Sequence, residues 1–506
     1  MRLLFHRRYS HIRQNTRLFR VRIPVFVLLL IIPSCILNPG CECFAQTDTG
    51  KRTEVIILHL NDMHASTSGF AKLKYLSDSL KRTHPYVFIV SAGDNFTGNP
   101  YVDMVADKGA PMIDLMNQAG FAVSCFGNHE FDLGQAFLEK RIDQARFPFI
   151  CANIKTGTSC LKQPPAYIVL KAGNLQIPII GLIEINHDGI PDTHPSKVKG
   201  LSFTDPLKTA GEYTEMKKQY GNLIALTHLG VETDEKLAEE YPSFDVIIGG
   251  HSHTILKKAL IDKGVMIDQA GSYQRFIGKL SLVFRGNSIE EKNDTLIATE
   301  SIQGADREIQ ALREQYENNP EFEKVAGEAV GSISGKQNLG ALMTDAMAWA
   351  AKTDFAFQNR GGIRIQSIPD GDIKVRDIYR LDPFGNQVMV FKMQGSEIAS
   401  LILNAYKKEK DIDLIPSGMR YMITKGKQGQ SPVLVMLNRS GKPLDPDKSY
   451  SVALNSYISA AYDFGHIREG VTLEMTTEDC LIRYLRKKHK VTYKDQERAT
   501  LQSIKE

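Results

Sequence analysis

The sequence predicts an α/β fold followed by a smaller α+β domain, and three observations support this. From residue 55 to about residue 285, short apolar runs bounded by glycine and polar residues alternate with helical patterns. Such runs suit strands that helices bury on both faces. A charged, helix-compatible segment at 306–324 then separates this region from a different pattern. A chain of 506 residues is also too long for one compact core.

The expected elements follow one another along the chain. We expect strands at 55–60, 86–92, 122–126, 149–153, 177–184, 223–227, 246–250 and 265–270, and helices at 70–80, 111–119 and 134–145. After the charged segment, which Pro320 interrupts, we expect a helix at 339–351, a glycine-rich turn at 359–364, strands at 388–393 and 450–454, and a basic helix near 483–489. The predicted domains are 52–300 and 329–500, joined by a linker helix at 301–328.

The first 45 residues differ from the rest in composition. Seven arginines precede an uncharged apolar run at 23–37, and small residues near Ala45 suit cleavage after it. The run is about five residues too short for a comfortable bilayer span. We therefore predict a signal peptide at 1–45 and a protein that is periplasmic or at the cell surface. A lipoprotein acylated at Cys35 is an alternative, although the surrounding residues match that signal poorly.

The predicted leader also accounts for the positive charge of the chain. The whole chain has a formal charge of +4, and the leader alone carries +6, because Glu42 is its one acidic residue. The remainder is about −2, so nothing favours binding to a nucleic-acid polymer.

Four cysteines lie beyond the leader. Cys125 falls inside an apolar run and is expected to be small core filler. Export permits a disulfide, and a bridge between Cys151 and Cys160 would close a short loop. No two cysteines have the C-x-x-C spacing, so a thiolate metal site is not predicted.

Polar residues gather where the expected strands end. These sets are Asp62/His64, Asp94/Asn95, Asn128/His129, His228 and His251/His253. The carboxyl ends of parallel strands meet at one edge of a sheet, so the sets should converge. We also expect the pairs at i, i+2 to lie on extended segments and therefore to face the same side. A single histidine of this kind can equally be a hydrogen-bonded structural residue.

The composition of these sets favours a metal centre. Four imidazoles with carboxylate and amide oxygens suit Zn²⁺ or Mn²⁺. Seven ligands are too many for one tetrahedral site and suit two ions that share a bridge. The predicted ligands are Asp62, His64, Asp94, Asn128, His228, His251 and His253.

Five motifs built on these residues resemble the calcineurin-like metallophosphoesterases in order and type. They are D-M-H at 62–64, G-D-N at 93–95, G-N-H-E-F-D at 127–132, T-H-L-G at 227–230 and G-G-H-S-H at 249–253. Downstream, N-R-G-G-I-R at 359–364 and P-F-G-N at 383–386, with Tyr457 and Asp463, resemble the secreted 5′-nucleotidase branch, which includes bacterial UDP-sugar hydrolases. The resemblance covers nearly the whole chain beyond the leader. It implies a four-layer α/β/β/α metallophosphoesterase domain before the α+β substrate-binding domain.

The resemblance also implies roles for the matching positions. Asp62, His64 and His253 would bind one ion, Asn128, His228 and His251 the other, and Asp94 would bridge them. His129 would stand near the scissile phosphate without binding metal, and Asp132 would orient it. The implied substrate-binding residues are Asn359 and Arg364 for phosphate, Phe384 and Tyr457 for a nucleobase, Asp463 for ribose hydroxyls, and Asn386. Either aromatic residue can equally be part of the core.

Two departures from the family pattern affect nucleotide selectivity. Where the family commonly has glycines near its second aromatic, this chain has Ala460, Ala461 and Tyr462 before Asp463. The family also often has an arginine shortly before the residue that matches Asn338, and here there is only Lys336. The predicted activity is hydrolysis of nucleoside 5′-monophosphates. Alternatives are 2′,3′-cyclic or 3′-nucleotides, UDP-sugars, and a non-catalytic nucleotide-binding surface protein. The sequence predicts no oligomeric state.

Overall fold

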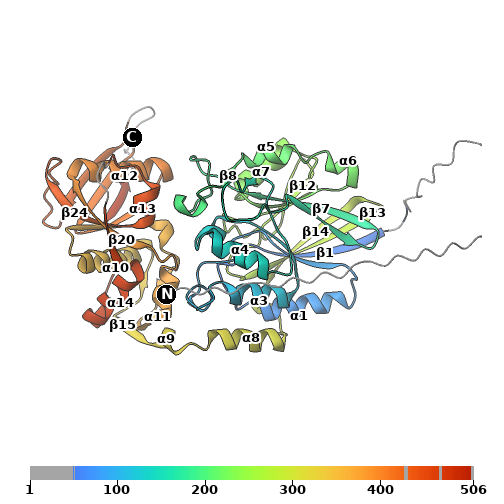
Figure 1. Cartoon of the computed structure of the whole chain (residues 1–506), viewed down its shortest axis with the longest axis horizontal. Coiled ribbons are helices and arrows are strands. Elements are labelled where there is room, and N and C mark those ends of the chain that lie inside the picture. Colours follow the sequence, from blue (N-terminus) through green and yellow to red (C-terminus); the bar gives the residue numbers. More distant parts are fainter. Residues whose placement is uncertain (1–49, 51, 427–430, 466–469, 503–506) are drawn as a thin grey trace, which may run out of the picture. The chain divides into compact units, whose positions relative to one another are not determined.

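A computed structural model describes residues 50, 52–426, 431–465 and 470–502 (Figure 1). The predicted signal peptide at 1–45, with Ala45 and Cys35, lies outside the described residues. Within the described ranges, no helix is long and apolar enough to cross a membrane.

The first region contains two six-stranded sheets. The first has the order β14-β13-β1-β2-β3-β4 and the second β11-β12-β10-β9-β7-β6. The strands of the first are β1 (Arg52–Leu60), β2 (Val87–Ser91), β3 (Phe121–Cys125), β4 (Phe149–Ile150), β13 (Phe276–Arg285) and β14 (Ser288–Ala298). Those of the second are β6 (Tyr167–Ala172), β7 (Leu175–Ile183), β9 (Ile224–His228), β10 (Val246–Ile248), β11 (Leu260–Asp262) and β12 (Val265–Asp268). Strands β5 (Ile154–Lys155) and β8 (Ser202–Phe203) form a separate pair.

Helices cover the outer face of each sheet, and Figure 1 shows them on opposite sides of the paired sheets. Helices α1 (Phe70–Lys81), α3 (Ala110–Ala119), α4 (Gln135–Gln144) and α8 (Arg307–Glu317) share a core with the first sheet. Helices α5 (Pro206–Gly211) and α7 (Val231–Glu240) share a core with the second, and α6 (Met216–Tyr220) packs at its margin. The short α2 (Pro100–Asp103) follows the β2 loop. These are the four layers that the sequence predicts.

Strand β1 shows why the apolar runs fold in this way. Val55 and Ile57 are fully buried in the core between the two sheets, which they share with Ile224. Ile56 and Leu58 are fully buried in the core beneath α1 and α3. Successive side chains of a strand point to opposite faces, so a strand between two apolar layers must be apolar at every position.

The hairpin of β13 and β14 is absent from the predicted elements. Strand β13 pairs antiparallel with β1, and β14 pairs antiparallel with β13 at the edge of the sheet. Of the two, β14 has mostly exposed or half-buried residues and a charged sequence. An edge strand of this kind has little apolar content, so no apolar run in the sequence marks β14.

Two short helices occupy the charged segment between the regions. Asp306 caps α8, because its Oδ1 accepts a hydrogen bond from the Ile309 N–H (2.9 Å). Pro320 begins α9 (Pro320–Glu323), and Asn319 caps it. A proline at the first helical position needs no hydrogen-bonded N–H, so Pro320 starts a second helix.

The second region is built around a five-stranded sheet with the order β21-β17-β24-β20-β25. Its strands are β17 (Phe355–Asn359), β20 (Gln387–Gln394), β21 (Leu414–Ser417), β24 (Ser449–Asn455) and β25 (Val471–Thr476). The helices are α10 (Lys336–Ala351), α11 (Val375–Leu381), α12 (Gly395–Glu409), α13 (Ser456–Ala461) and α14 (Thr477–Lys488). Smaller sheets contain β15 (Val325–Ala329), β16 (Ile333–Ser334), β18 (Ser367–Ile368), β19 (Gly371–Lys374), β22 (Met419–Thr424), β23 (Val433–Asn438), β26 (Lys490–Val491) and β27 (Ala499–Gln502).

The cysteines correct one expectation. Cys125 is fully buried and packs in the core between the sheets, as predicted. The Cys151–Cys160 disulfide is wrong, because both thiols are free. Cys151 is buried and its thiol donates a hydrogen bond to Asn153 Oδ1 (3.4 Å), whereas Cys160 is exposed.

Candidate metal centre and substrate cavity

The predicted ligands lie in loops at the carboxyl ends of parallel strands. Strands β1, β2 and β3 are mutually parallel in the first sheet, as are β9 and β10 in the second. Asp62 follows β1, Asp94 follows β2, and Asn128 follows β3. His228 ends β9, and His251 follows β10. The two sheets therefore bring their polar loop residues to one place.

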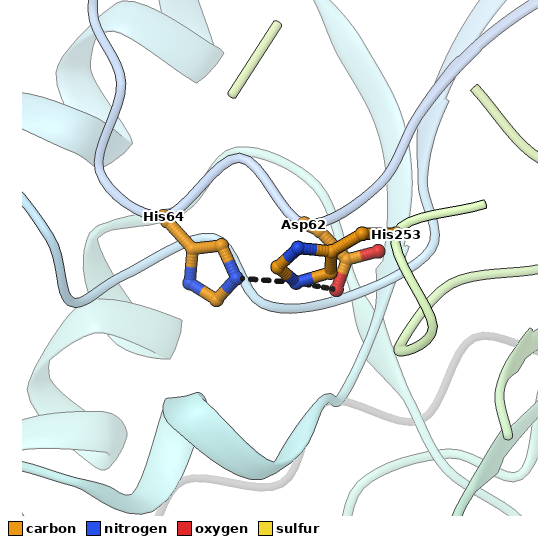
Figure 2. A group of neighbouring side chains, drawn as sticks. All are labelled: Asp62, His64 and His253. Atoms are coloured by element: carbon orange, nitrogen blue, oxygen red, sulfur yellow. Dashed lines mark hydrogen bonds and ion pairs between the residues drawn. The ribbon is translucent and has the colours of Figure 1, made fainter. Parts of the chain in front are cut away.

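Three of these residues form a compact group (Figure 2). Asp62 and His64 come from the loop after β1, and His253 comes from the loop after β10. His64 Nε2 lies 3.0 Å from His253 Nε2, and His253 Nε2 lies 3.4 Å from Asp62 Oδ1. Two donors that bind one ion at about 2.1 Å lie roughly 3–3.4 Å apart, so this spacing fits the coordination of one cation.

A second group joins the two sheets through Asp94. Its Oδ2 lies 3.2 Å from His228 Nε2, and Asp62 Oδ1 lies 3.8 Å from the same nitrogen. Asp94, Asp62 and His228 are all buried. The carboxylates of Asp62 and Asp94 thus lie close to His228, and Asp62 also lies close to His253. A ligand that bridges two ions would have to lie between the two groups in this way.

His228 provides the test of whether a cation fits. Its Nδ1 lies 2.7 Å from the Ala92 carbonyl oxygen, which can only accept, so Nδ1 carries a hydrogen. Its buried Nε2 has no hydrogen-bond partner among the residues that the structure describes, and it faces the two carboxylates. Burial alone would lower the pKa of His228, but Asp94 and Asp62 raise it to about 10. The carboxylates therefore demand positive charge at this point, which a divalent ion bound to neutral imidazole would supply.

The imidazoles of His64 and His251 are in the neutral form that binds metal. Burial and the Arg364 guanidinium hold the pKa of His64 well below its usual value. Burial and His228 lower the pKa of His251 to about 4. Asn128 completes this side of the site: its Nδ2 donates to the Asp192 carbonyl (3.0 Å), and its Oδ1 lies 3.1 Å from His251 Nδ1.

His129 and Asp132 form a separate pair. His129 Nδ1 lies 2.6 Å from Asp132 Oδ2, and the Thr193 hydroxyl donates to Asp132 Oδ1 (3.3 Å). His129 Nε2 lies 3.9 Å from Asp94 Oδ2. Burial alone would lower the pKa of His129, but Asp132 and Asp94 raise it above the usual value. The pair can therefore hold a proton on the ring beside the metal centre.

The loops reach this geometry through left-handed backbone, which corrects one prediction. The i, i+2 pairs do not lie on extended segments, because Asp62 (φ 49°), His64 (45°), His251 (80°) and His253 (55°) have positive φ, as does Asp94 (54°). Non-glycine residues seldom adopt this region, and such strain gathers at functional sites. His251 and His253 also face different partners, Asn128 and His64.

Gly127 allows the loops after β2 and β3 to touch. A Cβ at this position would lie 2.2 Å from Asp94 Oδ1. Without one, the His129 N–H donates to Asp94 Oδ1 (2.9 Å). The glycine of the G-N-H-E-F-D motif is therefore needed for close approach.

Three buried polar residues that support the loops are missing from the predicted set. Glu130 accepts hydrogen bonds from the N–H groups of Asp94, Asn95 and Gly127. The Asn61 amide donates to Asp62 Oδ2 (2.6 Å). Gln269 donates to the Gly250 carbonyl and accepts from Ser252 and Thr254. Asn61 and Gln269 both follow strands directly, so the strand-end rule that found the ligands could also have found them.

The second region contributes most of the predicted substrate residues to one cavity of about 430 Å³. Its lining includes Asn128, His129, Asp132, Asn359, Arg364, Phe384, Asn386 and Tyr457. The Phe384 ring stacks on the His129 ring (5.7 Å between centroids), and the Arg364 guanidinium lies 5.8 Å from the centre of the Phe384 ring. Arg364 Nη2 lies 3.0 Å from His64 Nε2. The Tyr457 hydroxyl donates to Asp192 Oδ1 (3.1 Å).

Two predicted substrate residues form hydrogen bonds within the protein, and a third lies outside this cavity. Asn359 Oδ1 accepts from the Asn455 amide (3.1 Å), and Asn386 Oδ1 accepts from the Ser456 hydroxyl (3.0 Å). Asp463 is exposed and lines a neighbouring cavity of about 730 Å³ with Asp192 and His251. The structure therefore does not bring Asp463 together with Phe384 and Tyr457 in one cavity.

Comparisons with known proteins agree with this architecture. Residues 55–254 match the family calcineurin-like phosphoesterase, and residues 324–464 match the family 5′-nucleotidase, C-terminal domain. A 5′-nucleotidase of Vibrio cholerae is 27% identical over 490 residues, which cover 83% of this chain and 87% of that protein. The endonuclease YhcR of Bacillus subtilis is 26% identical over 82% of this chain, which spans only 38% of that longer protein. The crystal structure of a 5′-nucleotidase precursor from Thermus thermophilus superposes with a TM-score of 0.79 at 26% identity, covering 89% of this chain and 99% of that one.

These matches identify the two regions of the chain: residues 55–254 form a calcineurin-like phosphoesterase domain. Residues 324–464 form a 5′-nucleotidase C-terminal domain. The predicted fold class is thereby confirmed.

Proposed function

We propose that this chain hydrolyses nucleoside 5′-monophosphates to the nucleoside and inorganic phosphate. The observation that carries the proposal is the cavity of about 430 Å³, which has Asn128 and His129 on one side and Phe384 and Arg364 on the other. A site for a nucleotide needs a flat apolar surface for the base beside charged groups for the phosphate. This cavity offers both within one enclosure.

We assign two ions, zinc or manganese, to the seven predicted ligands. One ion would be held by Asp62, His64 and His253, and the other by Asn128, His228 and His251, with Asp94 between them. The short distances among these donors and the unpartnered His228 Nε2 support the assignment. Bound there, such ions would supply Lewis acidity that activates water and neutralises phosphoryl charge.

The residues of the chain would then bind the substrate and move a proton. The Arg364 guanidinium, helped by the Asn359 amide, would hold phosphate oxygens. Phe384 and Tyr457 would bind the base. His129 would donate its Nε2 proton to the leaving oxygen or stabilise its charge, while Asp132 accepts from Nδ1–H and fixes the ring. Asn386 would support the Phe384 loop, and Asp463 would reach a ribose hydroxyl only from the neighbouring cavity.

Phosphate release from a substrate panel tests the proposal. The panel contains 5′-AMP, 3′-AMP, 2′,3′-cyclic AMP and UDP-glucose, each with added Mn²⁺ or Zn²⁺ and with a chelator. We expect preference for 5′-AMP and loss of activity with the chelator. Preference for another compound selects the corresponding alternative. Nucleotide binding without phosphate release from any compound would identify a non-catalytic binding protein.

We also propose that the protein is exported, and the arginine-rich and apolar composition of residues 1–45 supports this. Amino-terminal sequencing of protein from fractionated cells tests it: a start at Gln46 in an extracytoplasmic fraction is expected. Recovery of an intact leader in the cytoplasm would contradict it. We also propose the domain boundaries that the sequence predicts: a metallophosphoesterase domain at 52–300, a linker at 301–328 and a substrate-binding domain at 329–500.

A further inference from the structure

Two buried carboxyl groups adjoin the loop at 383–386 that carries Phe384. Asp382 is fully buried and directly precedes this loop. Glu478 is 1% exposed and lies in the first turn of α14. Neither of the two forms an ion pair with a cation in the part of the chain that the structure describes. We name Asp382 and Glu478 the carboxyl pair.

Asp382 lies where an ionised carboxylate would be costly. Neither of its carboxyl oxygens has a hydrogen-bond partner among the described residues. Burial and the Glu478 carboxylate raise the pKa of Asp382 well above its usual value, although the nearby Thr477 hydroxyl and Phe384 N–H oppose the shift. A buried carboxylate without donors takes up a proton instead of remaining charged. Asp382 is therefore the member of the carboxyl pair that carries a proton.

Glu478 is better placed to be the anion. Its Oε1 accepts a hydrogen bond from the Gly385 N–H (2.7 Å), and it lies at the N-terminus of a helix of 12 residues. Backbone N–H donors and the N-terminal end of a helix both favour negative charge. Burial nevertheless raises the pKa of Glu478, so a second charge beside it would be strongly unfavourable. One proton held by two carboxyl groups leaves a single negative charge.

The other titratable groups around the carboxyl pair are Tyr379 of α11 and Asp479, Cys480 and Arg483 of α14. Asp479 adds negative charge and raises the pKa of Glu478 further. Burial raises the pKa of the Tyr379 hydroxyl above its usual value and that of the Cys480 thiol to about 12, so both stay neutral near pH 7. Arg483 acts on the Cys480 thiol. Near neutral pH, the proton to be lost is therefore the one on the carboxyl pair.

The carboxyl pair is bonded to the loop whose Phe384 ring lines the cavity of about 430 Å³. Glu478 accepts from the N–H of the residue that follows Phe384, and the Thr477 N–H donates to the Asn386 carbonyl (3.0 Å). Asp382 is joined covalently to the start of the same loop. A movement of either carboxyl group would therefore shift the aromatic ring.

We propose that Asp382 and Glu478 hold one proton between them and act as positioning residues that keep the Phe384 ring in place to stack on a nucleobase. The inference rests on the proposed function, because it needs a base in that cavity. Loss of the proton to solvent leaves two buried negative charges side by side, and their repulsion displaces the loop. Binding of the base should then weaken as pH rises, whereas the contacts to the phosphate remain.

The test compares AMP with ribose 5-phosphate, which has the same sugar and phosphate but no base, from about pH 5 to about pH 9. For each we measure KM, or the inhibition constant where ribose 5-phosphate is not turned over. Titration of the phosphate and of the metal centre affects both compounds, so the ratio of the two constants isolates the base. In wild type, the preference for AMP should fall at high pH by about 5- to 150-fold, the value of one base stack.

Asp382→Asn keeps the shape of the side chain and replaces the proton with an amide donor, so the preference for AMP should stay at its low-pH value. Glu478→Gln retains an oxygen that accepts from the Gly385 N–H, and it should give the same result if the first variant fails to fold. The matched control is Asp372→Asn, at an exposed aspartate of β19, which should follow wild type. A preference that does not depend on pH in wild type, or that falls equally in wild type and Asp382→Asn, refutes the positioning role.

If wild type does not hydrolyse AMP, the proposed function fails and the carboxyl pair is tested by binding alone. Calorimetry then measures the affinity for adenosine, which carries the base without a phosphate, over the same pH range. Weaker binding at high pH in wild type but not in Asp382→Asn supports the positioning role. Absence of binding, binding that does not depend on pH, or an equal loss in both proteins refutes it.

Discussion

Glu130 offers a sharp test of how the metal loops are held. It is fully buried, and its carboxylate accepts four hydrogen bonds from the loops after β2 and β3. Its Oε2 accepts from the N–H groups of Asp94 (3.0 Å) and Gly127 (2.5 Å). Its Oε1 accepts from the N–H (2.7 Å) and the side-chain amide (3.0 Å) of Asn95. We predict that Glu130 positions Asp94 without touching metal or substrate.

The substitution Glu130→Gln allows the contribution of these hydrogen bonds to stability to be estimated. The amide keeps one accepting oxygen and places an NH₂ group against two N–H donors, so two hydrogen bonds are lost and two buried donors are left unpaired. An unpaired buried donor costs about 1–3 kcal/mol, which makes the total roughly 2–6 kcal/mol. For a domain of this size, 1 kcal/mol shifts Tm by about 2–4 °C. A shift of roughly 10 °C is therefore expected.

Part of this cost should appear as weaker metal binding, because Asp94 moves when its N–H loses its partner. We expect at least a tenfold weaker affinity for Zn²⁺ or Mn²⁺ by calorimetry and a lower kcat, with little change in KM for AMP. The matched control is Glu240→Gln, an exposed residue at the end of α7. A Tm within 2 °C of wild type together with unchanged metal affinity would refute the positioning role.

Three further predictions follow from the site. His129→Gln should lower kcat by roughly 10²- to 10⁴-fold while the metal content by elemental analysis stays the same, and a loss of metal would make His129 a ligand. Phe384→Ala should raise KM for AMP by roughly 5- to 150-fold, from a stack worth about 1–3 kcal/mol, and leave p-nitrophenyl phosphate unaffected. Asp103 is buried, which raises its pKa to about 6 although the N–H groups of Gly98 and Asn99 oppose the shift. The native state then keeps a proton that the unfolded state releases, so stability falls by about 3 kcal/mol as pH rises from about 4 to 6. Asp103→Asn should flatten this slope in denaturant unfolding, and parallel slopes would contradict the assignment.

The ligand set could be predicted because each ligand is adjacent in sequence to a strand that is itself easy to recognise. Strand β1 is apolar at every position from Val55 to Ile57, and the polar residues begin directly after it. The rule that parallel strands expose their carboxyl ends at one edge then places Asp62 and Asp94 together without any knowledge of side-chain contacts. His228 belongs to the second sheet and joins them because the two sheets pack face to face.

The conformation of those loops could not be predicted in the same way. A positive φ at Asp62 or His251 is unfavourable for the residue alone and persists only because buried partners hold the loop. The strand-end rule can mark a partner such as Gln269, but it does not show the hydrogen bond by which Gln269 holds the loop of His251. The prediction of extended pairs failed for this reason, although both members of each pair do reach the centre.

The positions of the substrate residues also depend on contacts that a local sequence pattern does not show. Phe384 and Tyr457 line one cavity, but Asp463 faces another, although only six positions separate it from Tyr457. Helix α13 ends at Ala461, and the hydroxyl of the next residue, Tyr462, donates to the buried Asp413 (2.7 Å). Because this hydrogen bond holds the Tyr462 side chain in the interior, the next residue, Asp463, faces the surface. The same tyrosine departs from the glycines that the family commonly has there, so the departure in sequence and the displaced aspartate have one physical cause.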